Sequence, residues 1–343
     1  MTAARTPLIR LEQVRKVFKL ESGLFAAGGR YVWAINGVSL DIGHGETYGL
    51  VGESGSGKTT LARTIVQLVP HTSGSILYYP SDDRPPGSSL GLVPGTAPWE
   101  ISRRDPRGLR RFRAQVKYVF QDPSSSLDPR MSVESILTAG ARYAPDYMGS
   151  EAVKQRAKEV MIAVGLRAAD LSRRPAEFSG GQRQRISLAR ALFGNPRALI
   201  CDEVVSALDV SIQGQILNLL VDLKRAYDLT ILFIAHDLTV VSYMADRIGV
   251  LYGGSLMEEA PARNLARRPL HPYTQLLYAS IPRLDAPAPG REAVAVAPAA
   301  TTHEPVGCPF RARCPLAREV CDRTAPELRE VAPGHRVACH FVR

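Results

Sequence analysis

The chain has 343 residues, a formal net charge of +10 and 45% hydrophobic residues. This length allows one large domain or two smaller ones with a substantial core. No apolar run is long enough to span a bilayer, and residues 1–11 lack the apolar core of a signal peptide. We therefore expect a chain that is made and kept in the cytoplasm, while the charge alone does not separate nucleic acid, anionic lipid or simple solubility.

Hydrophobic patterning predicts strands that alternate with helices along most of the chain. The expected strands cover residues 8–18, 34–42, 47–51, 116–120, 198–201 and 230–235, and the expected helices cover residues 58–68, 133–171, 182–192 and 212–226. We interpret the Gly-rich segment 21–30 as a loop, segment 79–99 as a surface insertion and the basic stretch 103–113 as a solvated helix face. The alternation indicates an α/β fold with a largely parallel sheet.

A complete phosphate-binding loop pattern, G-x-x-x-x-G-K-[ST], follows the expected strand 47–51. Its residues are Gly52, Glu53, Ser54, Gly55, Ser56, Gly57, Lys58 and Thr59. Glycines let backbone N–H groups turn toward phosphate oxygens, Lys58 reaches the β- and γ-phosphates, and the Thr59 hydroxyl holds Mg²⁺. The alternative, a glycine-rich turn without a ligand, does not explain why Lys-Thr stands in register between a strand and a helix.

Two further local patterns carry less weight when taken singly. The expected strand 198–201 runs into Asp202 and Glu203, which could hold Mg²⁺ through water and polarise an attacking water, although many strands end in acidic residues. Ser179, Gly180 and Gly181 precede a helix that we expect to start near Gln182, so their hydroxyl and N–H groups could form a second anion site. The alternative for the second pattern is a flexible turn.

Taken together, the motifs resemble those of the ATP-binding subunits of ABC transporters, in family order and over residues 8–283. They are the phosphate loop (Walker A), the Q-loop glutamine Gln121, the signature 179–182, the Walker B pair Asp202 and Glu203, the D-loop 206–209 and the switch histidine His236. The resemblance implies a P-loop NTPase with a RecA-like core and a helical subdomain at approximately 122–195. It also implies a head-to-tail dimer with two ATP molecules at the interface.

The family roles transfer to this chain position by position. ATP would be bound by Phe18, Gly52, Glu53, Ser54, Gly55, Ser56, Gly57, Lys58, Thr59, Thr60, Gln121, Ser179, Gly180, Gly181, Gln182 and Asp209. Thr59, Gln121 and Asp202 would serve Mg²⁺, Glu203 would be the general base, and His236 would contact the γ-phosphate. Phe18 is the first choice for stacking on adenine and Tyr31 the second. The family often has Pro after the glutamate, where this chain has Val204.

A more specific resemblance, to the dipeptide/oligopeptide importer branch, is carried by the sequences of residues 120–130, 205–211 and 271–274. Within this branch, the sequence of residues 205–211 is closest to that of the F-type ATPase. The resemblance implies a complex with a second, D-type ATPase, two permease subunits and an external solute-binding protein. The chain would then lie at the cytoplasmic face of the membrane and touch it only through the permeases, with no nucleic acid bound. Other solutes of the branch, nickel and glutathione, stay open, as do a nucleic-acid-associated ABC ATPase and a non-hydrolysing nucleotide sensor, which intact Glu203 and His236 argue against.

Four of the five cysteines, Cys308, Cys314, Cys321 and Cys339, cluster near the C-terminus with the spacing C-x5-C-x6-C-x17-C. Such clustering in a cytoplasmic chain suggests metal more than disulfides, but the close pairs typical of structural zinc are absent. The importer branch has a similar extension, and some members bind a [4Fe-4S] cluster there; zinc and unligated thiols are the alternatives. We expect His340 to be a bystander and Cys201 a core residue.

The predicted organisation is an ATP-binding domain at 1–283, an Ala/Pro-rich linker at 284–305 and a four-cysteine extension at 306–343. Because the extension is far from the ATP motifs in sequence, its expected role is structural.

Overall fold

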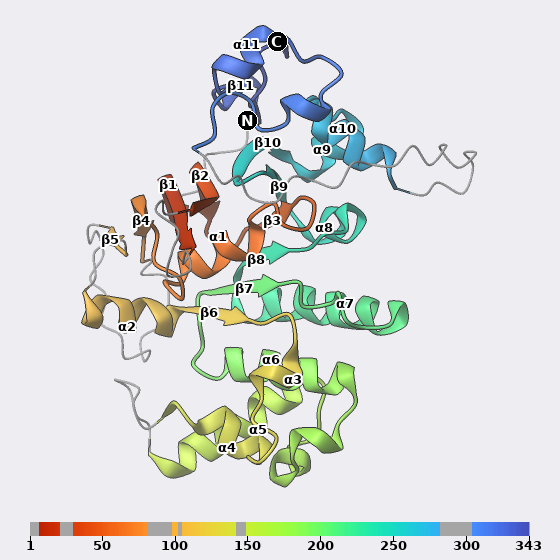
Figure 1. The fold of residues 1–343 in the computed structure, drawn as a ribbon. Helices are drawn as coiled ribbons and strands as arrows, with labels where there is room; N and C mark the ends of the chain where they lie inside the picture. The colour runs from red at the N-terminus through yellow and green to blue at the C-terminus, as the bar shows by residue number, and fades with distance from the viewer. Residues whose placement is uncertain are drawn as a thin grey trace. The chain divides into compact units, whose positions relative to one another are not determined.

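The structure is a computed structural model, and it describes residues 7–20, 30–80, 98–101, 105–141, 149–281 and 304–342. Most of the expected loop 21–30, insertion 79–99 and linker 284–305 lies outside these residues. The strands and helices alternate along much of the chain, and Figure 1 labels most of them. They are β1 (Pro7–Leu20), β2 (Arg30–Gly43), β3 (Thr47–Val51), α1 (Lys58–Ile65), β4 (Ser73–Tyr78), β5 (Trp99–Glu100), α2 (Pro106–Gln115), β6 (Val116–Val119), α3 (Pro123–Ser126), α4 (Val133–Thr138), α5 (Ser150–Ala163), α6 (Gly180–Leu192), β7 (Ala198–Asp202), α7 (Val210–Tyr227), β8 (Thr230–Ile234), α8 (Leu238–Met244), β9 (Arg247–Tyr252), β10 (Ser255–Pro261), α9 (Ala262–Arg267), α10 (Pro272–Ala279), α11 (Glu319–Arg323), β11 (Arg329–Ala332) and β12 (His335–Val337).

The chain forms two compact units that interleave along the sequence. The first unit contains Met1–Ile9, Ile42–Glu46 and Leu77–Leu232. The second unit contains Arg10–Asp41, Thr47–Ile76 and Phe233–Arg343. Each unit therefore combines segments that are distant in sequence, and β8 continues from the first unit into the second.

The first unit places β6 beside β7 in a parallel pair, with Tyr118 opposite Ile200 and Val119 opposite Cys201. All five residues of β7 are buried, as expected for a strand covered on both faces. The helices α3, α4, α5 and α6 pack on one another and form a group of their own in this unit, seen in Figure 1. This helical group lies within the range expected for the helical subdomain.

The second unit holds the strand that leads into the phosphate loop. Its sheet runs in the order β11, β12, β10, β9, β3, with β3 parallel to β9 and the remaining pairs antiparallel. A second sheet places β1 between β2 and β4. The C-terminal strands β11 and β12 therefore extend the same sheet as β3, which the sequence patterning did not predict.

Several predicted boundaries change in the structure. The helix expected at 58–68 ends at Ile65, because Gln67 adopts a left-handed backbone with φ of 55° and the chain turns there. Helix α6 begins at Gly180 rather than near Gln182, since Ser179 is its N-cap. The helical stretch expected at 133–171 is divided into α4, α5 and a short 3-10 helix at Ala168–Ser172.

Within the part of the chain that the structure describes, no helix is both long and apolar enough to cross a membrane.

Candidate functional site

The phosphate loop of the second unit requires glycine at two positions for reasons of space. Gly52 follows β3 with φ of 152°, and a Cβ there would lie 2.1 Å from the carbonyl oxygen of Leu251. Gly57 has φ of 105°, and a Cβ there would lie 2.6 Å from the carbonyl oxygen of Ala34. The loop is thus pressed against neighbouring backbone at both ends, and only glycine permits this path.

Lys58 begins α1 and bends back over the loop. Its Nζ donates to the carbonyl oxygens of Gly52 at 2.7 Å and Glu53 at 3.0 Å, and the side chain is buried. The hydroxyl of Ser56 is also buried, and among the described residues it has no hydrogen-bond partner. A buried ammonium, an unsatisfied hydroxyl and the N-terminus of α1 together suit a polyanion such as a nucleotide phosphate chain.

His236 lies in the same unit as the phosphate loop, directly after β8. Its neighbour Ala235 donates its N–H to the carbonyl oxygen of Leu50 in β3, which aligns the ends of these two strands. The side chain of His236 is exposed, and Asp237 after it caps α8 by accepting the N–H of Thr239 at 2.7 Å. The cap fixes the backbone on which His236 is presented.

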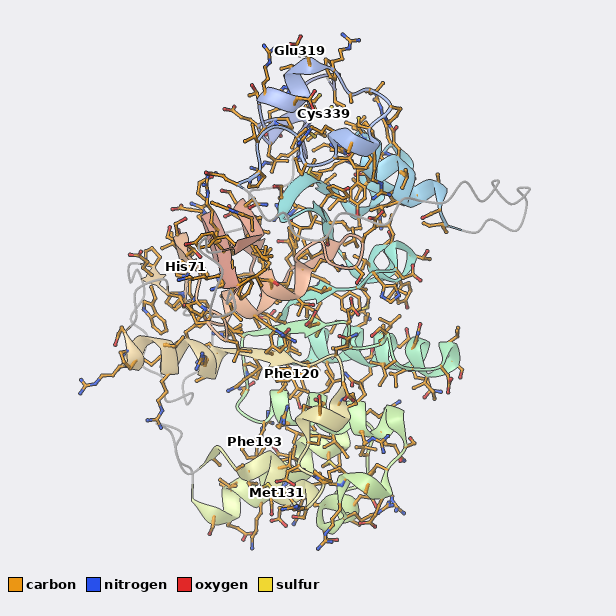
Figure 2. All side chains as sticks on the ribbon, in the orientation of Figure 1. His71, Phe120, Met131, Phe193, Glu319 and Cys339 are labelled. Atoms are coloured by element: carbon orange, nitrogen blue, oxygen red, sulfur yellow. The ribbon has the colours of Figure 1, made fainter. Side chains whose placement is uncertain are left out.

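In the first unit, the acidic end of β7 faces a tyrosine that the sequence did not indicate. Asp202 is 1% exposed, and its Oδ2 accepts the hydroxyl of Tyr118 at 2.5 Å. Tyr118 lies on β6, where its ring packs at 4.8 Å from that of Phe120, labelled in Figure 2. Nothing in the local sequence marks Tyr118, because its role depends on the pairing of β6 with β7.

Glu203 and Gln121 were predicted from separate motifs, and the structure brings them together. Nε2 of Gln121 donates to Oε2 of Glu203 at 2.9 Å, because the carboxyl ends of the parallel strands β6 and β7 meet. Glu203 has a left-handed backbone with φ of 50°, which is uncommon for this residue type and costs conformational energy. The N–H and hydroxyl of Ser206 hold this turn by donating to the Glu203 carbonyl.

The Ser-Gly-Gly-Gln segment forms a capping box at the start of α6. The hydroxyl oxygen of Ser179 accepts the N–H of Gln182 at 3.3 Å, and Oε1 of Gln182 accepts the N–H of Ser179 at 2.9 Å. A Cβ on Gly181 would lie 2.7 Å from Cγ2 of Ile212, whereas a Cβ on Gly180 would come no closer than 3.8 Å to Leu208. The capping bonds and the close approach of Ile212 thus give part of this motif a structural explanation.

The remaining predicted nucleotide contacts lie at exposed or partly exposed positions. Asp209 is exposed and is the N-cap residue of α7, without a side-chain capping bond. Phe18 on β1 is partly exposed, with Nζ of Lys16 at 4.6 Å from its ring centroid, and Tyr31 on β2 is 45% exposed.

The cysteine-rich tail, residues 306–342, belongs to the second unit and packs on the rest of that unit through Phe310. Phe310 is 1% exposed, with ring centroids at 5.2 Å from Tyr252 and 5.3 Å from Tyr273. In addition, His335 of β12 lies at 2.6 Å from the buried carboxylate of Glu258. The tail is therefore anchored by aromatic packing around Phe310 and by a buried polar pair.

The four tail cysteines lie close enough to influence one another electrostatically. Burial, together with a smaller effect of the other three cysteines, raises the pKa of Cys308 to about 11. Cys308 donates its N–H to the carbonyl of Cys321 at 2.7 Å, and Figure 2 shows Cys339 in the same tail. Cysteine thiolates are donors that suit a soft metal or an iron–sulfur cluster. Among the described residues, however, no three metal-binding side chains meet at ligand positions. His340, which we expected to be a bystander to any metal site, has its Nε2 2.9 Å from the Thr324 carbonyl oxygen.

One contact joins the tail to the phosphate loop, although the two segments are far apart in sequence. Arg313 of the tail pairs with the carboxylate of Glu53 in the phosphate loop, with N–O distances of 2.8 and 3.0 Å. The two residues are 260 positions apart, so sequence reasoning had no signal for this pair.

A glycine loop between a buried strand and a helix, an acidic strand end beside a glutamine, and a capped Ser-Gly-Gly-Gln helix define an ATP-binding cassette of the P-loop NTPase class. Comparisons with known proteins agree. The ABC transporter family matches residues 35–206, and the family described as the C-terminal region of oligopeptide/dipeptide transporters matches residues 257–321.

Relatives match nearly the whole chain. The oligopeptide transport ATP-binding protein AppF of Bacillus subtilis (strain 168) is 42% identical over 349 residues, which is 99% of each chain. A solved dimeric structure of the ATP-binding cassette MJ0796, in a post-hydrolysis state with ADP and Pi, is 26% identical with a TM-score of 0.61. The aligned region covers 74% of this chain and 99% of the MJ0796 chain. The chain therefore belongs to the ABC transporter family as an ATP-hydrolysing cassette that carries the oligopeptide/dipeptide transporter C-terminal region.

Proposed function

We propose that this chain hydrolyses ATP to power the uptake of di- or oligopeptides through a membrane ABC importer. The observation that carries the proposal is the end-to-end match to a relative named as an oligopeptide transport ATP-binding protein, in a chain whose catalytic motifs are complete. The match at residues 257–321 supports it from a second region of the chain.

The proposed roles follow the sequence-based assignment. Glu203 activates the attacking water as a general base. Its left-handed backbone and its hydrogen bond with Gln121 support this role, because they hold the side chain in one orientation. His236 contacts the γ-phosphate, and the phosphate loop with Thr60 binds ATP. Thr59, Gln121 and Asp202 serve Mg²⁺, for which the hydroxyl, amide and carboxylate oxygens are suitable donors. Adenine stacks on Phe18, with Tyr31 as the alternative.

We also propose a composite site in which Ser179, Gly180, Gly181, Gln182 and Asp209 act on nucleotide held by a second subunit. The solved cassette of similar fold is itself dimeric, which supports this arrangement. The partners would be a D-type ATPase, with this chain as the F-type, two permeases and an external solute-binding protein. The chain would lie at the cytoplasmic face of the membrane and bind no nucleic acid.

Transport by the assembled complex tests this function. The tagged full-length chain would be co-purified with its membrane partners, reconstituted in vesicles and supplied with labelled di- and oligopeptides. We expect ATP-dependent peptide uptake that is lost in the Glu203→Gln variant. Uptake of nickel or glutathione in place of peptides would reassign the solute, and co-purification with nucleic acid but no permease would contradict the proposal.

For the tail, we propose that Cys308, Cys314, Cys321 and Cys339 hold a [4Fe-4S] cluster, with Zn²⁺ as the alternative. The support is the clustering of four cysteines between residues 308 and 339, since thiolates are the ligands of such a cluster. When bound, such a centre crosslinks the segment and stabilises its local fold.

Metal analysis of anaerobically purified protein tests the cluster. We expect iron and sulfide in the wild type and their loss when any of the four cysteines is changed to Ser, while Cys201→Ala, in the buried strand β7, retains them. Stoichiometric zinc without iron would replace the cluster with a zinc site. Protein without any metal would contradict both.

A further inference from the structure

The C-terminal tail reaches the phosphate loop through one bidentate ion pair. Nη1 of Arg313 lies 2.8 Å from Oε2 of Glu53, and Nη2 lies 3.0 Å from Oε1. The pair is largely withdrawn from solvent, with the Arg313 side chain 11% and the Glu53 side chain 20% exposed. Two parallel charge-assisted hydrogen bonds in such surroundings are stronger and more directional than an exposed ion pair.

Arg313 is directed at the loop by rigid aromatic packing. It lies in a short 3-10 helix, Arg311–Arg313, and its guanidinium is 5.8 Å from the ring centroids of both Tyr252 and Phe310. Phe310 and Tyr273 are fully buried and lie against each other. The aromatic packing therefore orders the Arg313 side chain before it contacts Glu53, unlike an arginine on a mobile surface segment.

Glu53 is held at three separate points. Its N–H donates to the hydroxyl of Tyr273 at 2.9 Å, its carbonyl accepts Nζ of Lys58 at 3.0 Å, and its carboxylate binds Arg313. Tyr273 follows His271 and Pro272, which form the N-cap and first turn of α10. The body of the second unit thus restrains the backbone of Glu53, and the tail restrains its side chain.

We propose that Arg313 is a positioning residue for nucleotide binding, which holds Glu53 in the phosphate loop and neutralises its carboxylate. A loop that is already ordered loses less conformational entropy when it binds its ligand. A neutralised carboxylate also avoids repulsion of the triphosphate, which an unpaired Glu53 would exert at short range. The tail is then part of the ATP site's support. This inference goes beyond the proposed transport function and does not depend on the solute.

Equilibrium titration of the purified full-length chain with a fluorescent ATP analogue tests the role of Arg313. We expect Arg313→Ala to raise the Kd about tenfold, which corresponds to one lost charge-assisted interaction. Arg313→Lys should fall between the two, because an ammonium cannot reproduce the two-pronged contact. The matched control is Arg311→Ala, from the same 3-10 helix. Arg311 pairs with Asp322 of the tail at 3.1 Å, and its variant should keep the wild-type Kd.

A second variant separates action through Glu53 from loss of tail structure. If Arg313 acts through the carboxylate, Glu53→Gln combined with Arg313→Ala should bind ATP more tightly than Arg313→Ala alone, since no unpaired charge remains. A wild-type Kd in Arg313→Ala would overturn the proposal. So would an equal loss of affinity with and without Glu53→Gln, or an equal loss in Arg311→Ala. If Arg313→Ala does not fold, Arg313→Lys and its combination with Glu53→Gln give the same comparison.

Discussion

Glu203 combines a special backbone with a defined hydrogen-bond partner. Its φ of 50° turns the chain immediately after the buried Asp202, so the two consecutive acidic residues have different surroundings. Asp202 is held by Tyr118 inside the first unit, while Glu203 is more exposed and contacts Gln121. The same dipeptide thus presents one fixed carboxylate and one accessible carboxylate, which suits a metal-directed role and a base.

At this scale we predict that Glu203→Gln lowers ATP turnover of the assembled complex by about 10²–10⁴-fold, because the amide cannot accept a proton from water. ATP affinity should be retained, since the side-chain shape is conserved. Steady-state hydrolysis and nucleotide titration measure the two properties. Lys58→Ala is the contrasting variant and should weaken nucleotide binding itself. Turnover of Glu203→Gln at the wild-type rate would exclude Glu203 as the base.

At the scale of elements, the contact between α6 and α7 depends on a missing side chain. Gly181→Ala places a Cβ 2.7 Å from Cγ2 of Ile212, a branched side chain with little freedom to move. Overpacking of this kind costs about 1–3 kcal/mol, more than the roughly 0.5–1 kcal/mol that alanine adds to helix stability.

We therefore expect Gly181→Ala to lower the thermal unfolding midpoint. Gly180→Ala, whose nearest neighbour is at 3.8 Å, should leave the midpoint unchanged or raise it. Differential scanning calorimetry of both variants tests the contact. Equal midpoints in the two variants would show that α6 and α7 can separate without cost.

We predict that the stability of the first turn of α10 is sensitive to acid, because its N-cap is a buried histidine. His271 is 1% exposed, its Nδ1 accepts the N–H of Tyr273 at 3.0 Å, and burial lowers its pKa from 6.5 to about 4. Between these pH values the unfolded chain binds more protons than the folded chain, so stability falls as the pH decreases from 6.5 toward 4. The loss contributed by this group reaches about 3 kcal/mol near pH 4, at roughly 1.4 kcal/mol per pKa unit.

Chemical denaturation at several pH values measures this loss. His271→Asn supplies an alternative N-cap that does not titrate, and its stability should decrease less over the same pH interval. If wild type and His271→Asn lost stability in parallel, the acid sensitivity would arise elsewhere.

At the scale of the whole molecule, the isolated chain should be a poor ATPase. The proposed composite site takes its phosphate loop from one subunit and its signature segment, 179–182, from another, so a single copy has half of each site. Addition of the proposed D-type ATPase and permeases should raise the rate, and the rate of the isolated chain should increase with its concentration. High activity that is independent of concentration in a proven monomer would contradict the composite site.

Motifs contained in one short segment could be predicted from sequence because their chemistry is contiguous. The phosphate loop needs its glycines, Lys58 and Thr59 within eight positions, and the strand before it and the helix after it were both confirmed. Helix boundaries could not be predicted as closely, because the end of α1 depends on the backbone conformation of Gln67 and not on the hydrophobic periodicity. The antiparallel pairing of β10 with β9 and β12 was not predicted, since pairing partners are chosen by tertiary packing.

The sequence by itself determined the class of protein, the order of its nucleotide motifs and the presence of four clustered cysteines. Only the tertiary structure decided that Tyr118 binds Asp202, that Gln121 meets Glu203, and that Arg313 binds Glu53 across 260 positions. The physical reason is that local motifs reflect the backbone and chemistry of one segment. Contacts between distant residues instead require two packed elements to align, here the parallel strands β6 and β7 and the aromatic packing around Phe310.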